Sequence, residues 1–238
     1  MWLNAEPSFH ARRGLPAPDA ANNHLFKQLN MATPSPSTVV FDLGGVLIDW
    51  NPRYLYRKLL NSEAEVEDFL SEIGFASWNE QMDEGLSMAQ GVAEKIAEFP
   101  QHEVLIRAYS ERWPEMLGGA LEGTVRILEE LKRQETPLYV LSNWSAETFR
   151  FARERFAFLE HFDGLLVSGE EKLKKPDPAI FHRLYEKFSL RPEDCVFIDD
   201  RDDNIESARS TGMTGIVFTD SPDLRRQLVE MDLLSAQA

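Results

Sequence analysis

Residues 38–50, TVVFDLGGVLIDW, constrain the fold of this chain more than any other segment. Three β-branched residues and a phenylalanine lead into Asp42, and two glycines follow after one leucine. A short apolar run with a turn signal is typical of a buried strand that ends in a tight turn. The simplest interpretation is an ordinary strand and loop. The pattern also fits Asp42 at the carboxyl end of a parallel strand, where open α/β sheets bind ligands.

Length, charge and cysteine content narrow the class of protein. The 238 residues exceed one usual domain and fall short of two, which predicts one core with an insertion. The formal charge of −15, from 25 Lys and Arg against 40 Asp and Glu, disfavours a nucleic-acid partner. No apolar run approaches the roughly 18 residues of a membrane span, so we expect no membrane partner. Cys195 is the only cysteine and lies in the apolar run CVFI, which predicts a core thiol and a cytoplasmic protein.

The first 37 residues differ from the rest of the chain. They combine Pro, Ala, Ser and Asn without periodicity and lack the apolar core of a signal peptide. We interpret residues 1–37 as a disordered leader. Met31 lies just before the first strand, which gives the hypothesis that translation starts there. Peptides from residues 1–30 in a mass spectrum of the natural protein would refute this hypothesis.

A helical block follows the first strand. Between Pro52 and Leu117 apolar residues recur at helical spacing, for example at Val66 and Phe69. The pattern predicts about four helices. We expect residues 51–118 to form a cap above the carboxyl end of the first strand.

The remainder of the chain alternates strand and helix patterns. The strand patterns lie at residues 138–141, 163–167, 195–198 and 215–218. This order predicts βα units with right-handed crossovers. Residues 38–50 and 119–238 would then form an α/β fold with a doubly wound parallel sheet. Ser145 is expected to cap the helix that runs to about Arg155.

Polar residues follow three of these later strands. Ser142 and Asn143 come after the first, Lys175 after the second, and Asp199 and Asp200 after the third. Each alone has an ordinary explanation as a turn, a solvated loop or a helix cap. Because the carboxyl ends of parallel strands share one edge, these side chains should meet the carboxylate of the first strand in one crevice.

The chemistry of this set favours phosphoryl transfer. Asp42, Asp199 and Asp200 would repel one another without a hard cation between them, and oxygen ligands suit Mg²⁺. Lys175 adds a positive charge for phosphate oxygens, and Ser142 can donate to them. Asp42 can then attack phosphorus.

The motifs FDLGGVL, LSN, KKPDP and FIDDRDDNIESA resemble, in this order, the four motifs of the haloacid dehalogenase (HAD) superfamily over about residues 38–219. The helical insertion is similar to the cap of one large subgroup. The resemblance implies that Asp42 is the nucleophile and that Lys175 neutralises it and the phosphate. Ser142 and Asn143 would hold the transferring phosphoryl group.

The resemblance also implies a Mg²⁺ site and shows one departure. Asp42 and the Gly44 carbonyl would bind the metal, and Asp199 and Asp200 would hold it directly or through water. Superfamily phosphatases commonly carry a second Asp at the position of Gly44, which protonates the leaving oxygen. A glycine cannot do this, so we expect a substrate whose leaving group needs little protonation, such as a sugar 1-phosphate or an acyl phosphate. Equal activity on simple alkyl phosphates would contradict this expectation and would show that another group, Asp83 of the cap or an ordered water, supplies the proton. Some sugar-phosphate phosphatases of the superfamily share this Asp-Leu-Gly sequence.

The cap segment SWNEQMDEGLS holds two further candidates, Trp78 and Asn79, where an aromatic platform and an amide would meet a sugar. The competing explanation for Trp78 is a hydrophobic anchor within the cap. Arg53 either reaches the substrate or lies on a helix surface. Trp113 and Trp144 are expected to pack rather than to bind.

These observations predict a Mg²⁺-dependent phosphatase of a small phosphorylated metabolite, such as a sugar phosphate, that works through an aspartyl phosphate. The first alternative is a 2-haloacid dehalogenase, which needs no metal and leaves the acidic pair unexplained. The second is a catalytically weakened binding protein, because Gly44 lacks the acid. A receiver domain fits less well, since its acidic pair lies on the first strand.

Overall fold

The computed structural model describes residues 35–236. Most of the predicted leader, and with it the Met31 hypothesis, lies outside the described residues. The end of that segment is described, and the Ser37 N–H donates to the carbonyl of Asp194 at 2.9 Å. The backbone pairing of the core therefore starts before residue 38.

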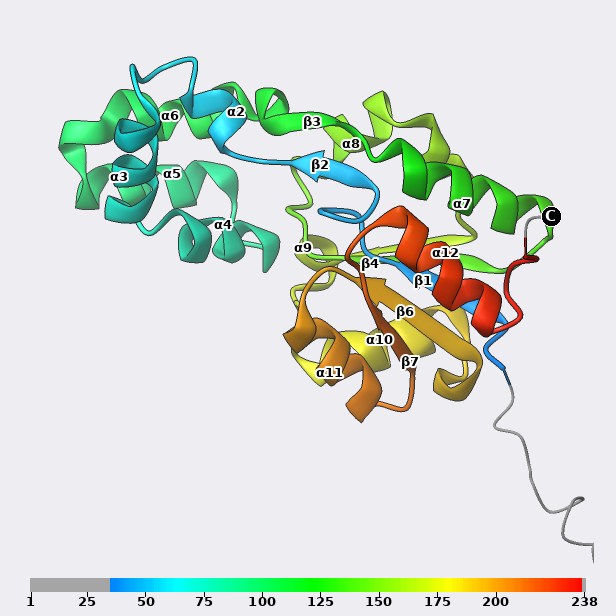
Figure 1. Ribbon diagram of the computed structural model, residues 1–238. Helices are drawn as coiled ribbons and strands as arrows, with labels where there is room; N and C mark the ends of the chain where they lie inside the picture. Colours follow the sequence, from blue (N-terminus) through cyan, green and yellow to red (C-terminus); the bar gives the residue numbers. More distant parts are fainter. Residues whose placement is uncertain (1–34, 237–238) are drawn as a thin grey trace, which may run out of the picture. The chain divides into compact units, whose positions relative to one another are not determined.

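A five-stranded parallel sheet forms the centre of the described chain (Figure 1). Its strands are β1 (Thr38–Phe41), β4 (Leu138–Ser142), β5 (Gly164–Val167), β6 (Cys195–Asp199) and β7 (Thr214–Val217). The order across the sheet is β5-β4-β1-β6-β7, and every neighbouring pair is parallel. The predicted α/β fold is confirmed. Since the chain builds the sheet first to one side of β1 and then to the other, a ligand crevice is expected at the carboxyl end of β1.

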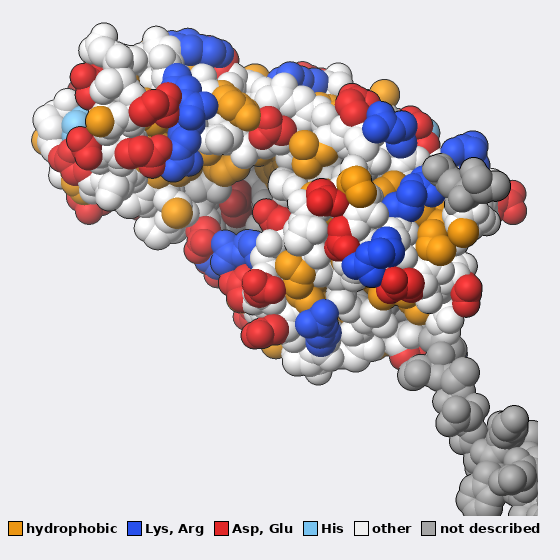
Figure 2. Space-filling model, in the orientation of Figure 1, with side chains coloured by type: hydrophobic (Ala, Val, Ile, Leu, Met, Phe, Trp, Pro, Cys, Tyr) orange, Lys and Arg blue, Asp and Glu red, His pale blue; other side chains and the backbone are white. Residues whose placement is uncertain are grey.

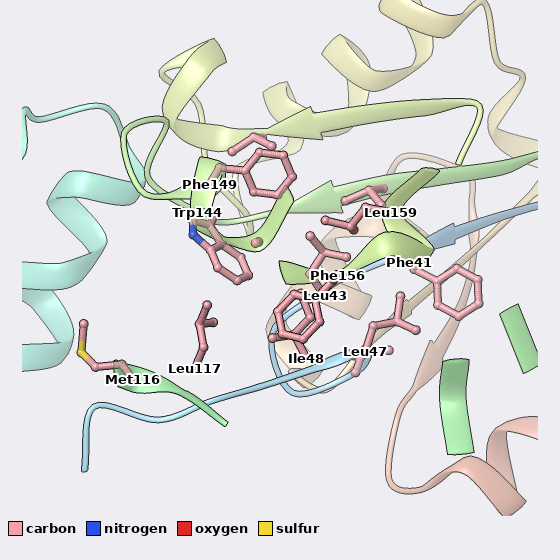
Figure 3. Packing of buried hydrophobic residues seen from close by; sticks show 14 of the residues in the cluster. Phe41, Leu43, Leu47, Ile48, Met116, Leu117, Trp144, Phe149, Phe156 and Leu159 are labelled. Atoms are coloured by element: carbon pink, nitrogen blue, oxygen red, sulfur yellow. The ribbon is translucent and has the colours of Figure 1, made fainter. Parts of the chain in front are cut away.

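Helices cover both faces of this sheet. One face carries α7 (Glu122–Arg133), α8 (Phe149–Arg155) and α12 (Ser221–Glu230), and the other carries α10 (Pro178–Phe188) and α11 (Asp202–Ser210). Strand side chains alternate between the faces, so Val39 and Phe41 join the first core and Val40 the second. Figure 3 shows part of the first core, which also contains Trp144 and Phe156.

The helical insertion lies between two short strands that no sequence pattern indicated. β2 (Ile48–Trp50) and β3 (Leu117–Ala120) pair antiparallel. The chain therefore leaves the core and returns to it at neighbouring points. The insertion consists of α2 (Arg53–Tyr56), α3 (Glu63–Glu72), α4 (Phe75–Asp83), α5 (Met88–Glu98), α6 (Glu103–Glu111) and the 3₁₀ turns Pro100–His102 and Trp113–Met116. The predicted helical character is present throughout this segment.

Local details of the later helices differ from the sequence predictions. Ser145 does not cap α8, because a turn separates them: the N-cap is Thr148, and Ser145 Oγ accepts from the Glu147 N–H at 3.3 Å. The short helix α9 (Ser168–Glu171), α12 and the 3₁₀ turns Ala157–His161 and Pro192–Asp194 were not predicted. None of these differences moves a strand end, so the edge of the sheet remains as expected.

Candidate active site

Asp42 is the first residue after β1, and its backbone is fixed on the neighbouring strand. Its N–H donates to the Ile198 carbonyl at 2.9 Å, and its side chain is 8% exposed. The chain then turns at Gly45, which has φ +73°, a conformation that favours glycine. A Cβ at Gly45 would also lie 2.4 Å from Asp200 Oδ2. Glycine is therefore required here both by the turn and by the close approach of Asp200, a role that the sequence pattern did not reveal.

Lys175 lies between two carboxylates in the floor of the site. Its Nζ is 3.0 Å from Asp42 Oδ1 and 2.6 Å from Asp199 Oδ2, and it donates to the Leu141 carbonyl at 2.9 Å. The lysine is 2% exposed. Burial opposes its charge, but Asp42 and Asp199 outweigh burial and raise the pKa of Lys175. The ammonium group is therefore held charged beside Asp42.

Asp199 is wholly buried and accepts three hydrogen bonds in addition to its ion pair with Lys175. The side-chain amide of Asn204 donates to both carboxylate oxygens, at 2.9 and 3.0 Å, and the Arg201 N–H donates to Oδ1 at 2.9 Å. Asn204 was not among the predicted site residues, although it lies within the FIDDRDDNIESA motif. Its amide orients Asp199, so Asp199 serves mainly to hold Lys175 and the local charge in place.

The carboxyl group of Asp42 has an unusual environment. The pKa of Asp42 is raised to about 6: burial is the largest cause and the charge of Asp199 acts with it, while the charge of Lys175 and a hydrogen bond from Ser142 act against it. Its Oδ1 is one of the buried side-chain atoms within residues 35–236 that have no hydrogen-bond partner. The contact with Lys175 Nζ is thus an ion pair without hydrogen-bond alignment.

Three carboxylates form an acidic group that suits a divalent cation. Ligand oxygens of Asp42, Asp199 and Asp200 lie within 4.8 Å of one another. Asp200 is exposed as a whole, but its carboxyl group is partly shielded from solvent. This shielding, followed by the charge of Asp199, raises the pKa of Asp200. The oxygen donor set and the buried Oδ1 of Asp42 fit Mg²⁺. Gly44 lines the same cleft, and the role of its carbonyl as a metal ligand stays a prediction.

Ser142 and Asn143 end β4 beside this cluster, but they differ in what they do. Ser142 is 1% exposed, and its side chain lowers the pKa of Asp42 through a hydrogen bond. Asn143 was predicted to hold the phosphoryl group, and its side chain contacts Lys175. Its Oδ1 accepts from the Lys175 N–H and its Nδ2 donates to the Lys175 carbonyl, both at 2.9 Å. The amide therefore positions the lysine loop, and the predicted phosphoryl-binding role of Asn143, which also lines the cleft, stays a prediction.

A cleft of about 590 Å³ opens over the cluster and is lined by both core and cap. Core residues include Asp42, Gly44 and Lys175, and cap residues include Asn79 and Asp83. A smaller cavity of about 90 Å³ adjoins it and is lined by Gly44, Trp50, Asn79, Asp83, Trp113, Asn143 and Trp144. Figure 2 shows acidic side chains within the hollow on the face in view. The cap thus forms one wall of the site.

The positions of three tryptophans differ in part from the predictions. Trp78 is 1% exposed, its Nε1 donates to the Gly91 carbonyl at 3.0 Å, and its ring packs on Tyr109 with centroids 4.5 Å apart. The prediction that Trp78 contacts the substrate is therefore wrong, because the helix turns this ring into the cap interior. Trp144 and Trp113 are buried as expected but also line the small cavity, which sequence reasoning missed.

Asn79 does reach the cleft, one residue after Trp78 on α4. Its Oδ1 accepts from the hydroxyl of Tyr109 and its Nδ2 donates to Asp83 Oδ2, both at 2.7 Å. Arg53 also lines the cleft, where it forms a two-point ion pair with Glu67 at 2.5 and 2.7 Å. The oxygen and the nitrogen of the Asn79 side chain are both hydrogen-bonded, and this contact orients Asp83.

The parallel sheet with helices on both faces is a Rossmann-like α/β fold, and its charged edge holds the candidate site. Residues 36–212 match the haloacid dehalogenase-like hydrolases, and the chain belongs to this family. The resemblance found in the four motifs is thereby confirmed.

Three relatives with phosphatase names are similar to this chain, two of them over about three quarters of it. A sesquiterpene phosphatase of Aspergillus oryzae is 27% identical over 76% of this chain and 89% of its own length. A phosphorylated carbohydrates phosphatase of Thermotoga maritima is 25% identical over 75% of this chain and 82% of its own. An N-acylneuraminate-9-phosphatase of Rattus norvegicus is 31% identical over 41% of this chain and 40% of its own.

Solved structures share the fold. A HAD family enzyme of Bacteroides thetaiotaomicron, in complex with magnesium and inorganic phosphate, has a TM-score of 0.60 and 24% identity over 78% of this chain and 95% of that chain. An L-2-haloacid dehalogenase of Xanthobacter autotrophicus has a TM-score of 0.59 and 15% identity over 84% of each chain. At these identities, the likeness concerns the fold alone.

Proposed function

We propose that the protein is a Mg²⁺-dependent phosphatase of a small phosphorylated metabolite and that it works through an aspartyl phosphate. The observation that carries the proposal is the geometry of Asp42. Asp42 lines the cleft, and its buried Oδ1 lies 3.0 Å from the charged Nζ of Lys175 without a hydrogen-bond partner. The phosphatase names of the relatives from Aspergillus oryzae and Thermotoga maritima support the proposal.

The protein side chains have separate tasks in this reaction. Asp42 attacks phosphorus, and the charge of Lys175 keeps Asp42 in the carboxylate form needed for attack. Ser142 donates to the developing charge on the phosphoryl oxygens, and the buried position of the site strengthens these interactions. Asn143 holds the backbone of Lys175 in place, and Asn204 holds the carboxylate of Asp199.

Asp42, Asp199, Asp200 and the Gly44 carbonyl would hold Mg²⁺. The ion supplies positive charge that offsets the repulsion between the acidic cluster and an anionic phosphate. This requirement follows from the net charge of −15 and from three carboxylates at one edge of the sheet.

The shape and lining of the site favour a small metabolite. The cleft of about 590 Å³ lies within the usual range of small-molecule sites, about 300 to 1,000 Å³. The adjoining cavity carries three tryptophans, which suits a leaving group with apolar surface as well as a sugar ring. We keep a sugar phosphate as the first candidate class and an apolar alcohol phosphate as the second.

A cytoplasmic location is part of the proposal. Cys195 is fully buried, and burial raises the pKa of its thiol to about 12, so it is an inert core thiol. Within residues 35–236, no helix is both long and apolar enough to cross a membrane. Fractionation of the natural cells tests the location, and recovery outside the cytoplasm would contradict it.

Dehalogenation is the competing function, because a haloacid dehalogenase shares the fold. The acidic cluster disfavours it, since three carboxylates would repel an anionic haloacid that brings no cation. Phosphate and chloride release from a mixed panel of phosphate esters and haloacids, with EDTA or with Mg²⁺, separates the functions. We expect Mg²⁺-dependent phosphate release. Chloride release that survives EDTA would favour the dehalogenase, and release of neither ion would favour a binding protein.

A further inference from the structure

The loop after β1 leaves a space in the site. Gly44 lines both the cleft and the small cavity, and no atom lies within 4 Å of the position that a Cβ would take there. Cleavage of an alkyl phosphate leaves an alkoxide, which departs readily only when it receives a proton. The backbone at Gly44 offers no side chain for this proton, so it has to come from another wall of the cleft.

Most titratable side chains that line the cleft are engaged in ion pairs or in the acidic cluster. Lys175 is locked between two carboxylates, and Asp42 and Asp200 belong to the acidic cluster. The others, except one, are held in ion pairs: Arg53 with Glu67, Glu80 with Lys174, and Arg201 with Asp203. Asp83 remains, and it lines both cavities.

Asp83 is held in one position by contacts from the cap and the core. Its Oδ2 accepts from the Asn79 amide, which in turn accepts from the Tyr109 hydroxyl, both at 2.7 Å. Its backbone carbonyl accepts from the hydroxyl of Ser168, at the start of α9. The same hydroxyl accepts from the Trp144 N–H at 2.9 Å. The end of α4 is thereby attached to the core beside the site.

The surroundings favour the protonated form of the Asp83 carboxyl. The pKa of Asp83 is raised from 3.8 to about 7; burial is the largest cause, and the charges of Glu80 and Asp42 act in the same direction. The backbone N–H of Ser145 and the charge of Lys174 act in the opposite direction. Lys174 pairs with Glu80 and Glu84 at 3.3 Å, and no described ion pair joins a cation to Asp83. Near neutral pH both protonation states of Asp83 are therefore populated.

We propose that Asp83, on the cap, is the general acid and base of this enzyme, acting from the opposite wall to the empty position beside Gly44. The inference rests on the proposed phosphatase function. In the first step an Asp42 oxygen bonds to phosphorus, and the bond from phosphorus to the leaving oxygen breaks. Its electron pair goes to that oxygen, which takes the Asp83 proton and leaves as the alcohol.

The second step restores the enzyme. The Asp83 carboxylate accepts a proton from water as the water oxygen bonds to phosphorus. The bond from phosphorus to the Asp42 oxygen breaks, and its electron pair returns to Asp42. Phosphate is released, Asp42 is again a carboxylate, and Asp83 is again protonated.

A series of phosphate esters with Mg²⁺ tests the assignment. For Asp83→Asn we expect kcat/KM to fall by about 10² to 10⁴ on an alkyl phosphate and by no more than about threefold on dinitrophenyl phosphate, which needs no acid. Glu84→Gln is the matched control, because Glu84 is exposed and adjacent to Asp83. It should keep the parent dependence on the leaving group.

A second variant distinguishes proton transfer from structural support. In the Asp83→Asn background, Gly44→Asp places a carboxyl in the open space at that position and should restore at least about tenfold of the alkyl phosphate activity. In the unmodified protein, kcat/KM on the alkyl phosphate should fall as pH rises above about 7, while that on dinitrophenyl phosphate should not. The pH measurement decides the question even if the variants fold poorly.

The outcomes separate this inference from the proposed function. If the parent releases phosphate but Asp83→Asn loses activity equally on all esters, or the parent pH profiles coincide, the assignment of Asp83 is wrong and the function stands. If the parent releases phosphate from no ester with Mg²⁺, the proposed function fails and the assignment fails with it.

Discussion

The two walls of the cleft are built on different physical principles. On the core side, Lys175, Asp42 and Asp199 are buried charges that compensate one another at distances of 2.6 to 3.0 Å. On the cap side, Asp83, Asn79 and Tyr109 form a hydrogen-bonded chain beside aromatic rings. In the proposed reaction, the core fixes the phosphoryl group by charge. The cap, in the same proposal, determines which leaving group can be accommodated and protonated.

The largest expected effect concerns the core wall. Asp42→Asn should lower phosphatase activity by about 10⁴-fold or more, because an amide is a very poor nucleophile. Phosphate release measures the loss, and circular dichroism checks the fold. Asp68→Asn, at an exposed acid of the cap, should retain parent activity. Substantial turnover by Asp42→Asn would remove this residue from the mechanism.

Adjacent lysines offer a second test of the contrast. Lys175→Met should lower the free energy of unfolding by about 3–5 kcal/mol, because it leaves Asp42 and Asp199 buried without a counter-charge. Lys174→Met is the control, since Lys174 pairs with carboxylates of the cap that are about half exposed, and should cost less than about 1 kcal/mol. Urea unfolding measures both. Equal losses would show that the core charges are not coupled as described.

A pair of tryptophans tests the cap wall. Trp78→Ala should cost about 3–5 kcal/mol of unfolding free energy and leave substrate preference unchanged, because this ring packs inside the cap. Trp50→Leu should cost less and change substrate preference, because Trp50 is half-buried and lines both cavities. Thermal melts and kcat/KM on a sugar phosphate and an apolar alcohol phosphate distinguish them. A change of preference in Trp78→Ala would restore its predicted role.

The smallest expected effect is the pH dependence of stability at Asp83. The pKa of this carboxyl is raised from 3.8 to about 7 in the folded state, so the folded state binds more protons than the unfolded state between these values. The stability that this proton contributes is present below about pH 4 and is lost as pH rises through about 7. Asp83→Asn cannot ionise.

The free energy of unfolding of Asp83→Asn should therefore rise by about 1–3 kcal/mol relative to that of the parent as pH rises from about 5 to about 8. Melting temperatures at both pH values measure the gain, with Glu84→Gln as the control. A difference between variant and parent that is independent of pH would show that Asp83 is ionised in the folded protein throughout.

The core wall was largely predictable from the sequence. Buried parallel strands appear as short apolar runs, and their carboxyl ends must share one edge, so Asp42, Lys175 and Asp199 were placed together from chain order alone. What the sequence did not predict is which groups hold them. Asn143 holds the Lys175 loop, and Asn204 orients Asp199. These are contacts between distant segments, which no local pattern encodes.

By itself, the sequence determined the fold class, the order of the motifs and the missing side chain at residue 44. Only the tertiary structure decided which cap residues face the site. Trp78 and Asn79 are neighbours on α4, and a rotation of about 100° per residue along the helix turns one into the cap interior and the other toward the cleft. The environment of Asp83 was decided in the same way. Its burial depends on how α4 packs against the core, and that burial sets its pKa.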